Sequence, residues 1–326
     1  MEDLRTPLDT IKVATNGFSD IFEQGTFGTV YKGELSQSKD HNLVMVMRLD
    51  RNHMEDFYGE EFRKEMAKLY SYRHKNIVPL VGFCEEANER ILVFEHMVNG
   101  SLKEHLKNTS LTWKERLKIC MDAAHGLDHV HNGVEMQRSI HGDIKSSSIL
   151  LNHDWEAVIS DFIISKGAAT LGYYDPLHVV TSILTQKSDI YSFGVVLFEI
   201  LSGRLAMETL QREDKQLFHD MLDVGHENRE SDAEEKEQVI FLARLAAQCF
   251  KNKRLEEIIF DGIKGQIDAQ SLAIFSAIAY QCLQEKLEDR PKMVEVVKEL
   301  QKALECQVSS HIRSTKLRMH QWQAHV

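Results

Sequence analysis

The sequence lacks a surplus of positive charge, and this limits the partners that it can recruit. Its 326 residues include 39 Lys and Arg against 50 Asp and Glu, for a formal net charge of -11. Long-range electrostatics would repel phosphate backbones and anionic lipid headgroups rather than attract them. We therefore expect no nucleic-acid partner.

Cysteine pairs and long apolar runs are also missing. No CxxC pair occurs, so neither a zinc site nor a disulfide framework is predicted, and the cysteine usage fits a reducing cytosol. No apolar run approaches the roughly 20 residues that span a bilayer. The first residues carry neither a signal-peptide charge pattern nor a myristoylation glycine. We expect a cytoplasmic protein without a transmembrane segment. The five cysteines are Cys84, Cys120, Cys249, Cys282 and Cys306.

What the sequence does contain is a change of pattern near residue 99. Before it, short β-branched and apolar runs predict strands at 29–31, 43–47 and 91–94, with one helix at 59–72. After it, helical spacing dominates, so we expect an α+β protein in which a strand-rich small lobe precedes a larger helical lobe. The predicted helices of the second lobe cover 113–131, 188–202, 236–250, 269–284 and 293–304.

These patterns divide the chain into four expected parts. An N-terminal extension covers 1–17, the small lobe 18–97, the large lobe 98–305 and a flexible tail 306–326. A polar, mostly acidic stretch between Glu208 and Glu235 is interpreted as a solvated loop and surface helix, with a recognition element as the alternative. The tail is mildly basic, and we expect it to be frayed.

An ordered series of motifs runs through both lobes. It begins with a glycine-rich stretch in which Gly25 and Gly28 follow Glu23, a pattern that by itself fits a plain hairpin equally well. The motifs are EQGTFGTV at 23–30, FRKE at 62–65, HKNIV at 74–78, EHMVNGSL at 95–102, HGDIKSSSIL at 141–150, ISDFI at 159–163, GYYDP at 172–176, KSDIYSFG at 187–194 and DRP at 289–291. In this order the series resembles the protein-kinase signature set, and its sequence is most similar to plant receptor-like cytoplasmic serine/threonine kinases. The resemblance runs from about residue 14 to residue 304.

The resemblance implies a bilobal kinase fold that binds ATP and Mg²⁺ between its lobes. It implies Asp143 as the catalytic base, Lys145 as a phosphate contact, and Asp161 and Ser148 as metal ligands, with Ser148 at the position of an asparagine. The residues implied to contact the nucleotide are Gly25, Gly28, Val30, Met47, Glu65, Glu95, Met97 and Leu150.

The third strand departs from this family pattern. Met47 stands where active members carry a lysine, so Glu65 loses its expected partner. Arg48 cannot replace that lysine, because neighbouring side chains of a strand point to opposite faces. Met45 replaces a small alanine on the same face as Met47, so two flexible apolar side chains should project into the nucleotide site.

The metal-binding loop and the segment after it depart as well. Ser148 is a shorter ligand than asparagine, and Ile163 replaces a glycine, which should stiffen the turn. The segment from Asp161 to position 176 is short, with Ser165 and Thr170 as its remaining phosphorylation candidates. Gly142 replaces the arginine that would bind such a phosphate.

One structural position departs from the family pattern. Leu177 replaces the glutamate that should pair with Arg290, so this arginine must find another acceptor or remain exposed.

The other structural positions are retained. The resemblance implies an apolar spine across the lobes and an aspartate, Asp189, that anchors the catalytic-loop backbone, although a helix cap is the alternative for Asp189. The spine residues are Leu69, Leu80, His141 and Phe162.

Two functions follow from these departures. The first is a pseudokinase that acts as a scaffold or allosteric partner of an active kinase or of a receptor cytoplasmic domain, recruited to the plasma membrane through that partner. The second is a weakly active serine/threonine kinase that uses Asp143, Lys145 and Asp161 with a substitute cation, for which Lys32 is the nearest candidate. We expect binding of ATP and Mg²⁺ to be lost or weak.

Overall fold

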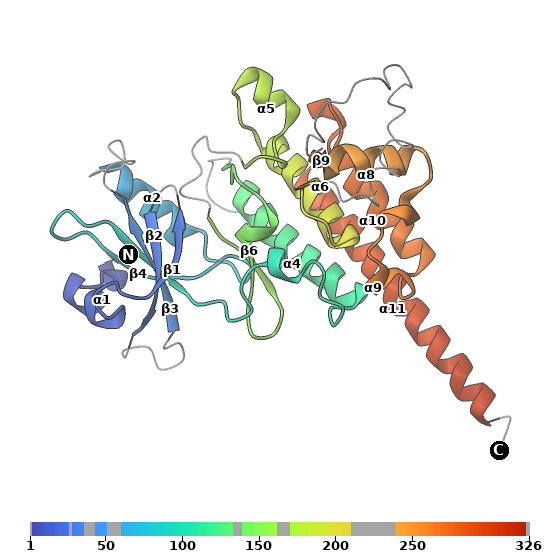
Figure 1. Ribbon diagram of the computed structural model, residues 1–326, viewed down its shortest axis with the longest axis horizontal. Coiled ribbons are helices and arrows are strands. Elements are labelled where there is room, and N and C mark those ends of the chain that lie inside the picture. Colours follow the sequence, from blue (N-terminus) through green and yellow to red (C-terminus); the bar gives the residue numbers. More distant parts are fainter. Residues whose placement is uncertain are drawn as a thin grey trace, which may run out of the picture.

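The computed structural model describes the chain except residues 1, 26–27, 36–42, 51–59, 133–138, 162–169, 210–238 and 324–326. For residues 25, 60, 61, 65, 209, 239, 240 and 311–323 it describes the backbone alone. Phe162, Ile163, Ser165 and most of the acidic stretch therefore lie outside the described residues. Figure 1 shows a strand-rich lobe, in blue and cyan, beside a larger helical lobe.

The small lobe is built on a five-stranded antiparallel sheet. The strand order is β1-β2-β3-β5-β4. Helix α2 (Glu60–Ser71) lies between β3 and β4 in the sequence and packs against the sheet. The predicted strands at 29–31, 43–47 and 91–94 and the predicted helix at 59–72 are confirmed. The strands are β1 (Ile21–Gly25), β2 (Gly28–Glu34), β3 (Leu43–Leu49), β4 (Leu80–Cys84) and β5 (Ile91–Glu95).

Alternation along β3 separates two apolar clusters. Val44 and Val46 pack with the N-terminal helix α1 (Leu8–Ala14) on one side of the sheet. Met47 and Leu49 pack with Phe62 of α2 on the other side. Because successive strand residues point to opposite faces, this register decides which side chains reach the space between the lobes.

The N-terminal segment covers the edge of the sheet. A short 3-10 helix, η1 (Glu2–Leu4), leads into a bridge between Arg5 and Phe83 of the edge strand β4, where the Thr6 amide donates to the Phe83 carbonyl at 2.8 Å. Gly82 permits this approach, since an added Cβ there would lie 2.5 Å from Thr6 Oγ1. The segment thereby satisfies backbone groups that an open edge would expose.

The large lobe surrounds the buried helix α6 (Gln186–Ser202). Gly194 lets α10 cross closely, because a Cβ there would lie 2.6 Å from Cys282 Cβ. The other long helices are α4 (Trp113–Asn132), α8 (Leu242–Lys251), α10 (Ala269–Cys282) and α11 (Met293–Gln323). The short elements are α3 (Leu102–His105), α5 (Pro176–Thr181), α9 (Asp261–Lys264), η3 (Ser146–Ser148), η4 (Leu255–Glu257), η5 (Leu287–Asp289), and the strand pairs β6 (Ile149–Leu151) with β7 (Ala157–Ile159) and β8 (Met207–Thr209) with β9 (Val239–Phe241).

Two predicted helix bounds need correction. The helix predicted at 236–250 begins only at Leu242, because Val239–Phe241 form β9 and pair with β8. The helix predicted at 293–304 continues to Gln323 and projects from the helical lobe at the C-terminal end in Figure 1. The tail from 306 onward, which we expected to be frayed, is therefore helical through Gln323. Its flexibility stays a prediction.

Candidate functional site

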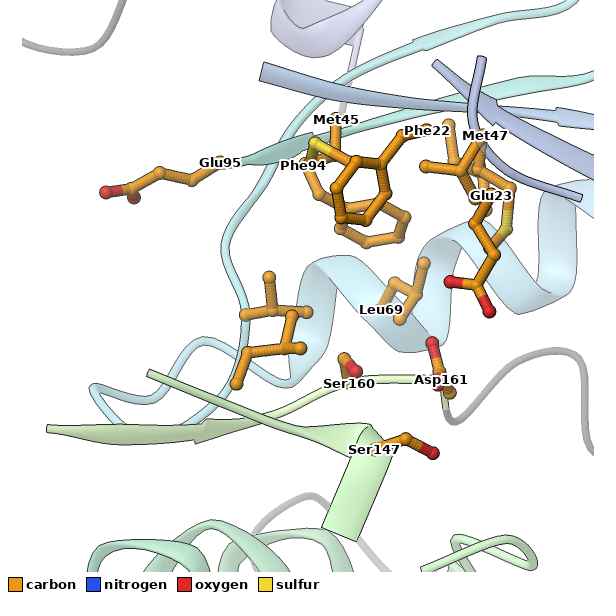
Figure 2. A pocket seen from close by; sticks show the side chains of 14 residues that line it. Phe22, Glu23, Met45, Met47, Leu69, Phe94, Glu95, Ser147, Ser160 and Asp161 are labelled. Carbon is orange, nitrogen blue, oxygen red and sulfur yellow. The ribbon is translucent and has the colours of Figure 1, made fainter. Parts of the chain in front are cut away.

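A small cavity lies between the sheet and the large lobe. Its volume is about 130 Å³, and Figure 2 shows the sheet side chains above it and the loop after β7 below it. Both lobes contribute, as expected for a site at their junction. The lining residues are Phe22, Glu23, Val30, Met45, Met47, Leu69, Val78, Leu92, Phe94, Glu95, Ser147, Leu150, Ser160 and Asp161.

The register of β3 directs both methionines to this cavity. Met45 pairs with Phe94 of β5, and Met47 pairs with Leu92. Arg48, which follows Met47 along β3, faces the other side, where its Nε and Nη2 donate to the Glu89 carboxylate at 2.8 and 2.6 Å. The prediction that Arg48 cannot reach the site is therefore confirmed.

Lys32 does not supply a cation inside the cavity. Its Nζ lies 4.9 Å from the centroid of the Phe22 ring. Burial, followed by the charge of Lys32, lowers the pKa of His96 just after β5. Lys32 lies opposite Met45 in the pairing of β2 with β3, so it shares the cavity face of the sheet, but no Lys, Arg or His occurs among the described residues that line the cavity.

Two carboxylates occupy the opposite end of the cavity from the hinge. Figure 2 shows the Glu23 carboxylate directed down from β1 toward Asp161. The pKa of Asp161 is raised to about 6, chiefly by burial, with a lowering by Lys145 and smaller increases from the charges of Asp143 and Glu23. Carboxylate charge at this end would repel a phosphate group that no metal ion bridges.

Only some of the residues predicted to contact a nucleotide line the cavity among the described residues. Val30, Glu95 and Leu150 line the cavity, whereas Met97 is buried against Val78 and Val158 beside it. The backbone of Glu65 lies in α2, but its side chain is outside the description, as are contacts of the loop between Gly25 and Gly28.

The loop that carries Asp143 forms a closed network. Asp143 Oδ1 accepts from the Thr170 hydroxyl at 2.8 Å and from the Thr170 amide at 3.2 Å. Lys145 Nζ forms an ion pair with Asp143 and donates to Thr170 Oγ1 at 3.1 Å. The sequence suggested Thr170 only as a phosphorylation candidate, so its contact with Asp143 and Lys145 was not predicted. The available signal was the position of Thr170 just before the GYYDP motif.

The Ser148 hydroxyl forms hydrogen bonds with the backbone of the same loop. The side chain is fully buried, and its Oγ accepts from the Lys145 amide at 3.0 Å while lying 2.9 Å from the Lys145 carbonyl and 3.2 Å from that of Asp143. The Ser148 carbonyl accepts from the Ser160 amide at 2.8 Å. These contacts hold the short 3-10 turn η3 between the loop and β6.

Asp189 anchors the start of this loop. Its carboxylate accepts from the amides of His141 and Gly142, each at 2.8 Å, and from His131 Nε2 at 2.8 Å. Thr185 instead caps α6, since its hydroxyl accepts from the Ser188 amide. The anchor prediction for Asp189 is confirmed, and the helix-cap alternative is wrong.

The expected spine is described in three of its four positions. Leu69 and Leu80 belong to one apolar cluster with α2 and the sheet. His141 is buried, and its Nε2 lies 2.8 Å from the Ser160 carbonyl. Phe162 lies outside the described residues, so the continuous spine stays a prediction.

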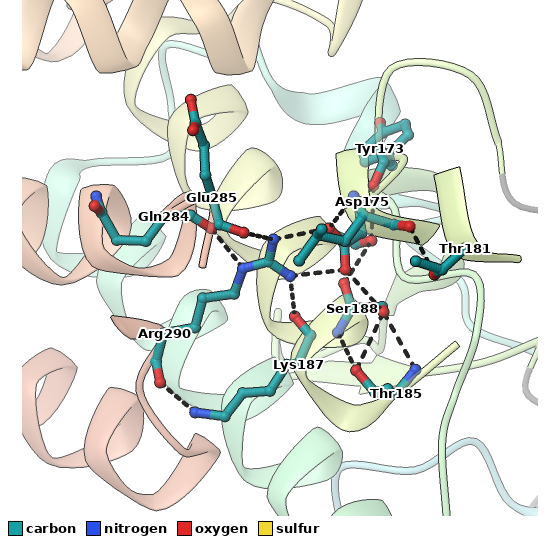
Figure 3. Close-up of polar contacts among 11 residues, drawn as sticks. Tyr173, Asp175, Thr181, Thr185, Lys187, Ser188, Gln284, Glu285 and Arg290 are labelled. Carbon is teal, nitrogen blue, oxygen red and sulfur yellow. Dashed lines mark hydrogen bonds and ion pairs between the residues drawn. The ribbon is translucent and has the colours of Figure 1, made fainter. Parts of the chain in front are cut away.

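Arg290 finds an acceptor that the motif comparison did not suggest. Its Nη2 and Nη1 donate to the two carboxylate oxygens of Asp175 at 2.7 and 2.8 Å (Figure 3), and the two side chains are 0% and 1% exposed. The same guanidinium donates to the carbonyls of Gln284 and Lys187. Arg290 is therefore buried and paired, although Leu177 replaces its expected partner.

Asp175 holds two further groups besides Arg290. It caps α5 by accepting from the Leu177 amide at 3.0 Å, and it accepts from the Ser188 hydroxyl at 2.9 Å. Burial by itself would raise the pKa of Asp175, but the bonds and charge of Arg290 outweigh it, so the pKa lies below its ordinary value.

Comparison with known proteins identifies this architecture. A family described as "Protein tyrosine and serine/threonine kinase" matches residues 18–300. The chain belongs to this protein-kinase family. The expected fold, with a strand-rich first lobe and a helical second lobe, is confirmed.

Relatives of this kinase chain are plant receptor-like kinases. It is 37% identical over 322 residues to "Receptor-like protein kinase HERK 1" and 36% identical over 319 residues to "Receptor-like protein kinase FERONIA", both from Arabidopsis thaliana. These matches cover 93% and 92% of this chain but 35% and 32% of the relatives. The chain therefore spans about a third of their length. Within the residues that the structure describes, no helix is both long enough and apolar enough to cross a bilayer.

A solved structure similar to this kinase fold is that of a pseudokinase. The pseudokinase domain of BIR2, described as an immune regulator of the RLK/Pelle family, superposes with a TM-score of 0.71 at 28% identity. The match covers 93% of this chain and 89% of that structure.

Proposed function

We propose that this chain is a pseudokinase domain that acts as a scaffold or allosteric partner of an active kinase or receptor. The observation that carries the proposal is the face of β3, where Met45 and Met47 line the cavity and no basic side chain joins them among the described residues. Phosphoryl transfer depends on positioning and on neutralising phosphate charge. Within the described lining, no basic side chain is present to supply that neutralisation.

The size of the cavity supports the same proposal. Sites for drug-sized ligands hold about 300–1,000 Å³, whereas this cavity holds about 130 Å³. The family uses ATP and Mg²⁺, and we propose that the side chains that line this space leave too little room for the base of a nucleoside triphosphate. The thioethers of Met45 and Met47 take up room that a small residue and a lysine stem would leave.

The metal ligands are weakened in parallel. The Ser148 hydroxyl is buried in contacts with the Lys145 backbone, so using it for Mg²⁺ would leave the partly buried Lys145 amide without its acceptor. Asp161 keeps its carboxylate, toward which the Glu23 carboxylate is directed from β1. We therefore propose that Mg²⁺ is held weakly here.

The comparison with BIR2 favours a regulatory role. That protein is described as a pseudokinase and an immune regulator of the same wider family, and we propose that this chain works in the same manner, by contact rather than by catalysis. We further propose that it works in the cytoplasm and reaches the plasma membrane only through a partner.

A weak serine/threonine kinase is the second candidate. The network of Asp143, Lys145 and Thr170 favours it, because the candidate base is ordered and partly buried beside a lysine. If this candidate were right, the chain would have to bind ATP without a lysine on β3.

Differential scanning fluorimetry with ATP and Mg²⁺ separates the two candidates. A ligand at 100 times its dissociation constant stabilises a protein by about 2.7 kcal/mol. We expect no stabilisation at millimolar ATP with Mg²⁺, while the kinase domain of HERK 1 under the same conditions serves as the positive control. A saturable shift that requires Mg²⁺ would overturn the proposal, and a phosphate-transfer assay of the wild type against Asp143→Asn would then decide whether catalysis follows.

A further inference from the structure

A groove runs between helix α10 and the first turns of helix α11 on the large lobe. Its volume is about 730 Å³, which is within the range of about 300–1,000 Å³ that is usual for binding sites. The α10 wall presents Ala273 and Ala277, one turn apart, whose single methyl groups leave the groove open beside Ile274 and Ile278. The groove follows α10 for about 12 Å, or roughly two turns of helix.

The rim of this groove is acidic. Glu288, Asp289 and Glu295 line it with exposed carboxylates, whereas Lys298 is the exposed cation among the described residues of the lining. The other charged lining residues are each ion-paired with a residue outside the groove, as Arg290 with Asp175 and Glu299 with Lys302. The groove therefore favours an occupant that carries positive charge.

The walls of the groove select a helix as the occupant. The backbone groups of α10 and α11 are bonded within their own helices, so neither wall offers a free edge to which a strand could add. Two packed helices instead leave a furrow into which the side-chain ridges of a third helix fit. An amphipathic helix with basic flanks matches both the shape and the charge of this groove.

The C-terminal end of α11 has that composition. No acidic residue occurs from position 306 to 326, and Arg313, Lys316 and Arg318 are basic, in a chain whose formal net charge is -11. Apolar residues stand at positions 308, 312, 319 and 322, and these spacings of four, seven and three place them on one face of a helix. The tail is thus opposite in charge to the groove and has apolar positions to bury.

The tail cannot reach the groove of its own chain while α11 is intact. Gln307 is still held by the large lobe, where its Nε2 donates to the Gln266 carbonyl at 2.8 Å and its Oε1 accepts from the Asp268 amide at 2.8 Å. Beyond it α11 continues as one helix to Gln323 and projects from the lobe in Figure 1. At 1.5 Å per residue, position 311 lies about 18 Å along the axis from Glu299 of the groove, and the helix runs away from it.

We propose that residues 308–323 of one chain bind as a helix in the groove between α10 and α11 of a second copy, with their basic side chains against Glu288 and Asp289. The contact joins two different surfaces, so the copies associate head to tail. The inference goes beyond the proposed function, because it requires neither ATP binding nor its loss. Since the pairing is between exposed charges, the association is sensitive to salt.

Sedimentation velocity of the full chain over a concentration series tests the association. We expect the average sedimentation coefficient to rise with concentration at about 0.1 M salt. The rise should weaken at about 1 M salt, where the Debye length falls from about 10 Å to about 3 Å. A chain that stays monomeric at every concentration would overturn the inference, and so would an association that salt does not weaken.

A matched pair of variants places the contact in the groove. Glu288→Lys with Asp289→Lys reverses two exposed charges of the rim and should weaken association about tenfold or more. Asp20→Lys with Glu34→Lys changes the net charge equally, at exposed positions of the small lobe outside the groove, and should associate no more weakly than the wild type. Equal losses in both variants would indicate general surface charge and reject the groove. A groove variant that associates like the wild type would mean that the tail binds elsewhere, such as the acidic stretch at 208–235, and would also reject it.

A charge swap tests whether the tail and the groove contact each other directly. Lys316→Glu with Arg318→Glu gives the tail the same sign as the groove, so this variant alone should not associate. An equal mixture of the tail variant and the groove variant should associate again, because each one carries the surface that complements the other's changed surface. Circular dichroism checks that both variants are folded. If the mixture of folded variants stays monomeric, the proposed contact is wrong.

Discussion

Two regions of this chain depart from the kinase pattern at a charged position, and they differ in what takes its place. In the large lobe, Leu177 removes a glutamate, yet Arg290 is paired because Asp175 receives its guanidinium at 2.7 and 2.8 Å. Under β3, Met47 removes a lysine, and no basic side chain among the described lining residues replaces it. A buried charge needs compensation for the fold to form, whereas a phosphate-binding charge is needed only if phosphate binds.

The largest expected effect comes from breaking the compensated pair. Asp175→Ala would leave Arg290 buried without its carboxylate and would remove the α5 cap, so the free energy of unfolding should fall by about 3–5 kcal/mol. Urea denaturation monitored by circular dichroism measures this loss. Because Arg290 holds the pKa of Asp175 below its ordinary value of 3.8, the pair's contribution is complete above pH 3.8. It is lost as the pH falls through the lower folded-state pKa.

The control and the rescue for this pair use neighbouring positions. Glu288→Ala removes an exposed carboxylate from η5 and should change stability by less than about 0.5 kcal/mol. Adding Leu177→Glu to Asp175→Ala should recover part of the loss if the usual family position still reaches Arg290. A loss in Asp175→Ala no larger than in Glu288→Ala would show that this ion pair does not support the fold.

A smaller effect should come from the catalytic loop, where the serine has a structural contact. Ser148→Ala deletes the acceptor of the partly buried Lys145 amide, and a donor left unsatisfied away from water costs about 1–3 kcal/mol. Urea denaturation measures it, with the partly exposed Ser147→Ala as the matched control. Equal stability of the two variants would mean that the Ser148 hydroxyl remains free to serve a metal.

Restoring charge under β3 tests the uncompensated region directly. Met47→Lys with Met45→Ala should enlarge the cavity and supply a cation, so ATP with Mg²⁺ at ten times its dissociation constant should stabilise the variant by about 1.4 kcal/mol in a thermal-shift assay. Met47→Leu with Met45→Ala enlarges the cavity without the charge and should show no shift. A shift in both would attribute the block to volume alone, and a shift in neither would place the block elsewhere.

The sequence predicted the fold and the apolar face of β3 because both depend on local rules. Strand alternation places Met45 and Met47 on one face and Arg48 on the other, and the ordered motifs locate the two lobes. It did not find Asp175 as the partner of Arg290, since 115 positions separate them and only the packed helices bring them together. The β9 strand was missed for a related reason, because its pairing with β8 depends on a contact that is distant in the chain.

The smallest expected effect concerns the two carboxylates that face each other across the cavity. Burial is the largest cause of the raised pKa of Asp161, about 6, and Glu23 contributes less. Glu23→Gln should therefore lower the pKa of Asp161 by a fraction of a unit and leave it above its ordinary value of 3.8, as carboxyl-carbon NMR titration would measure.

The same change should alter stability in a pH-dependent way. A raised pKa penalises the ionised form of the folded protein, and this penalty grows as the pH rises from 3.8 through 6. The variant should be slightly more stable than the wild type above pH 6 and should lose that advantage in acid. An unchanged pKa of Asp161 would mean that the Glu23 charge does not reach it, and the negatively charged end of the cavity would then consist of Asp161 alone.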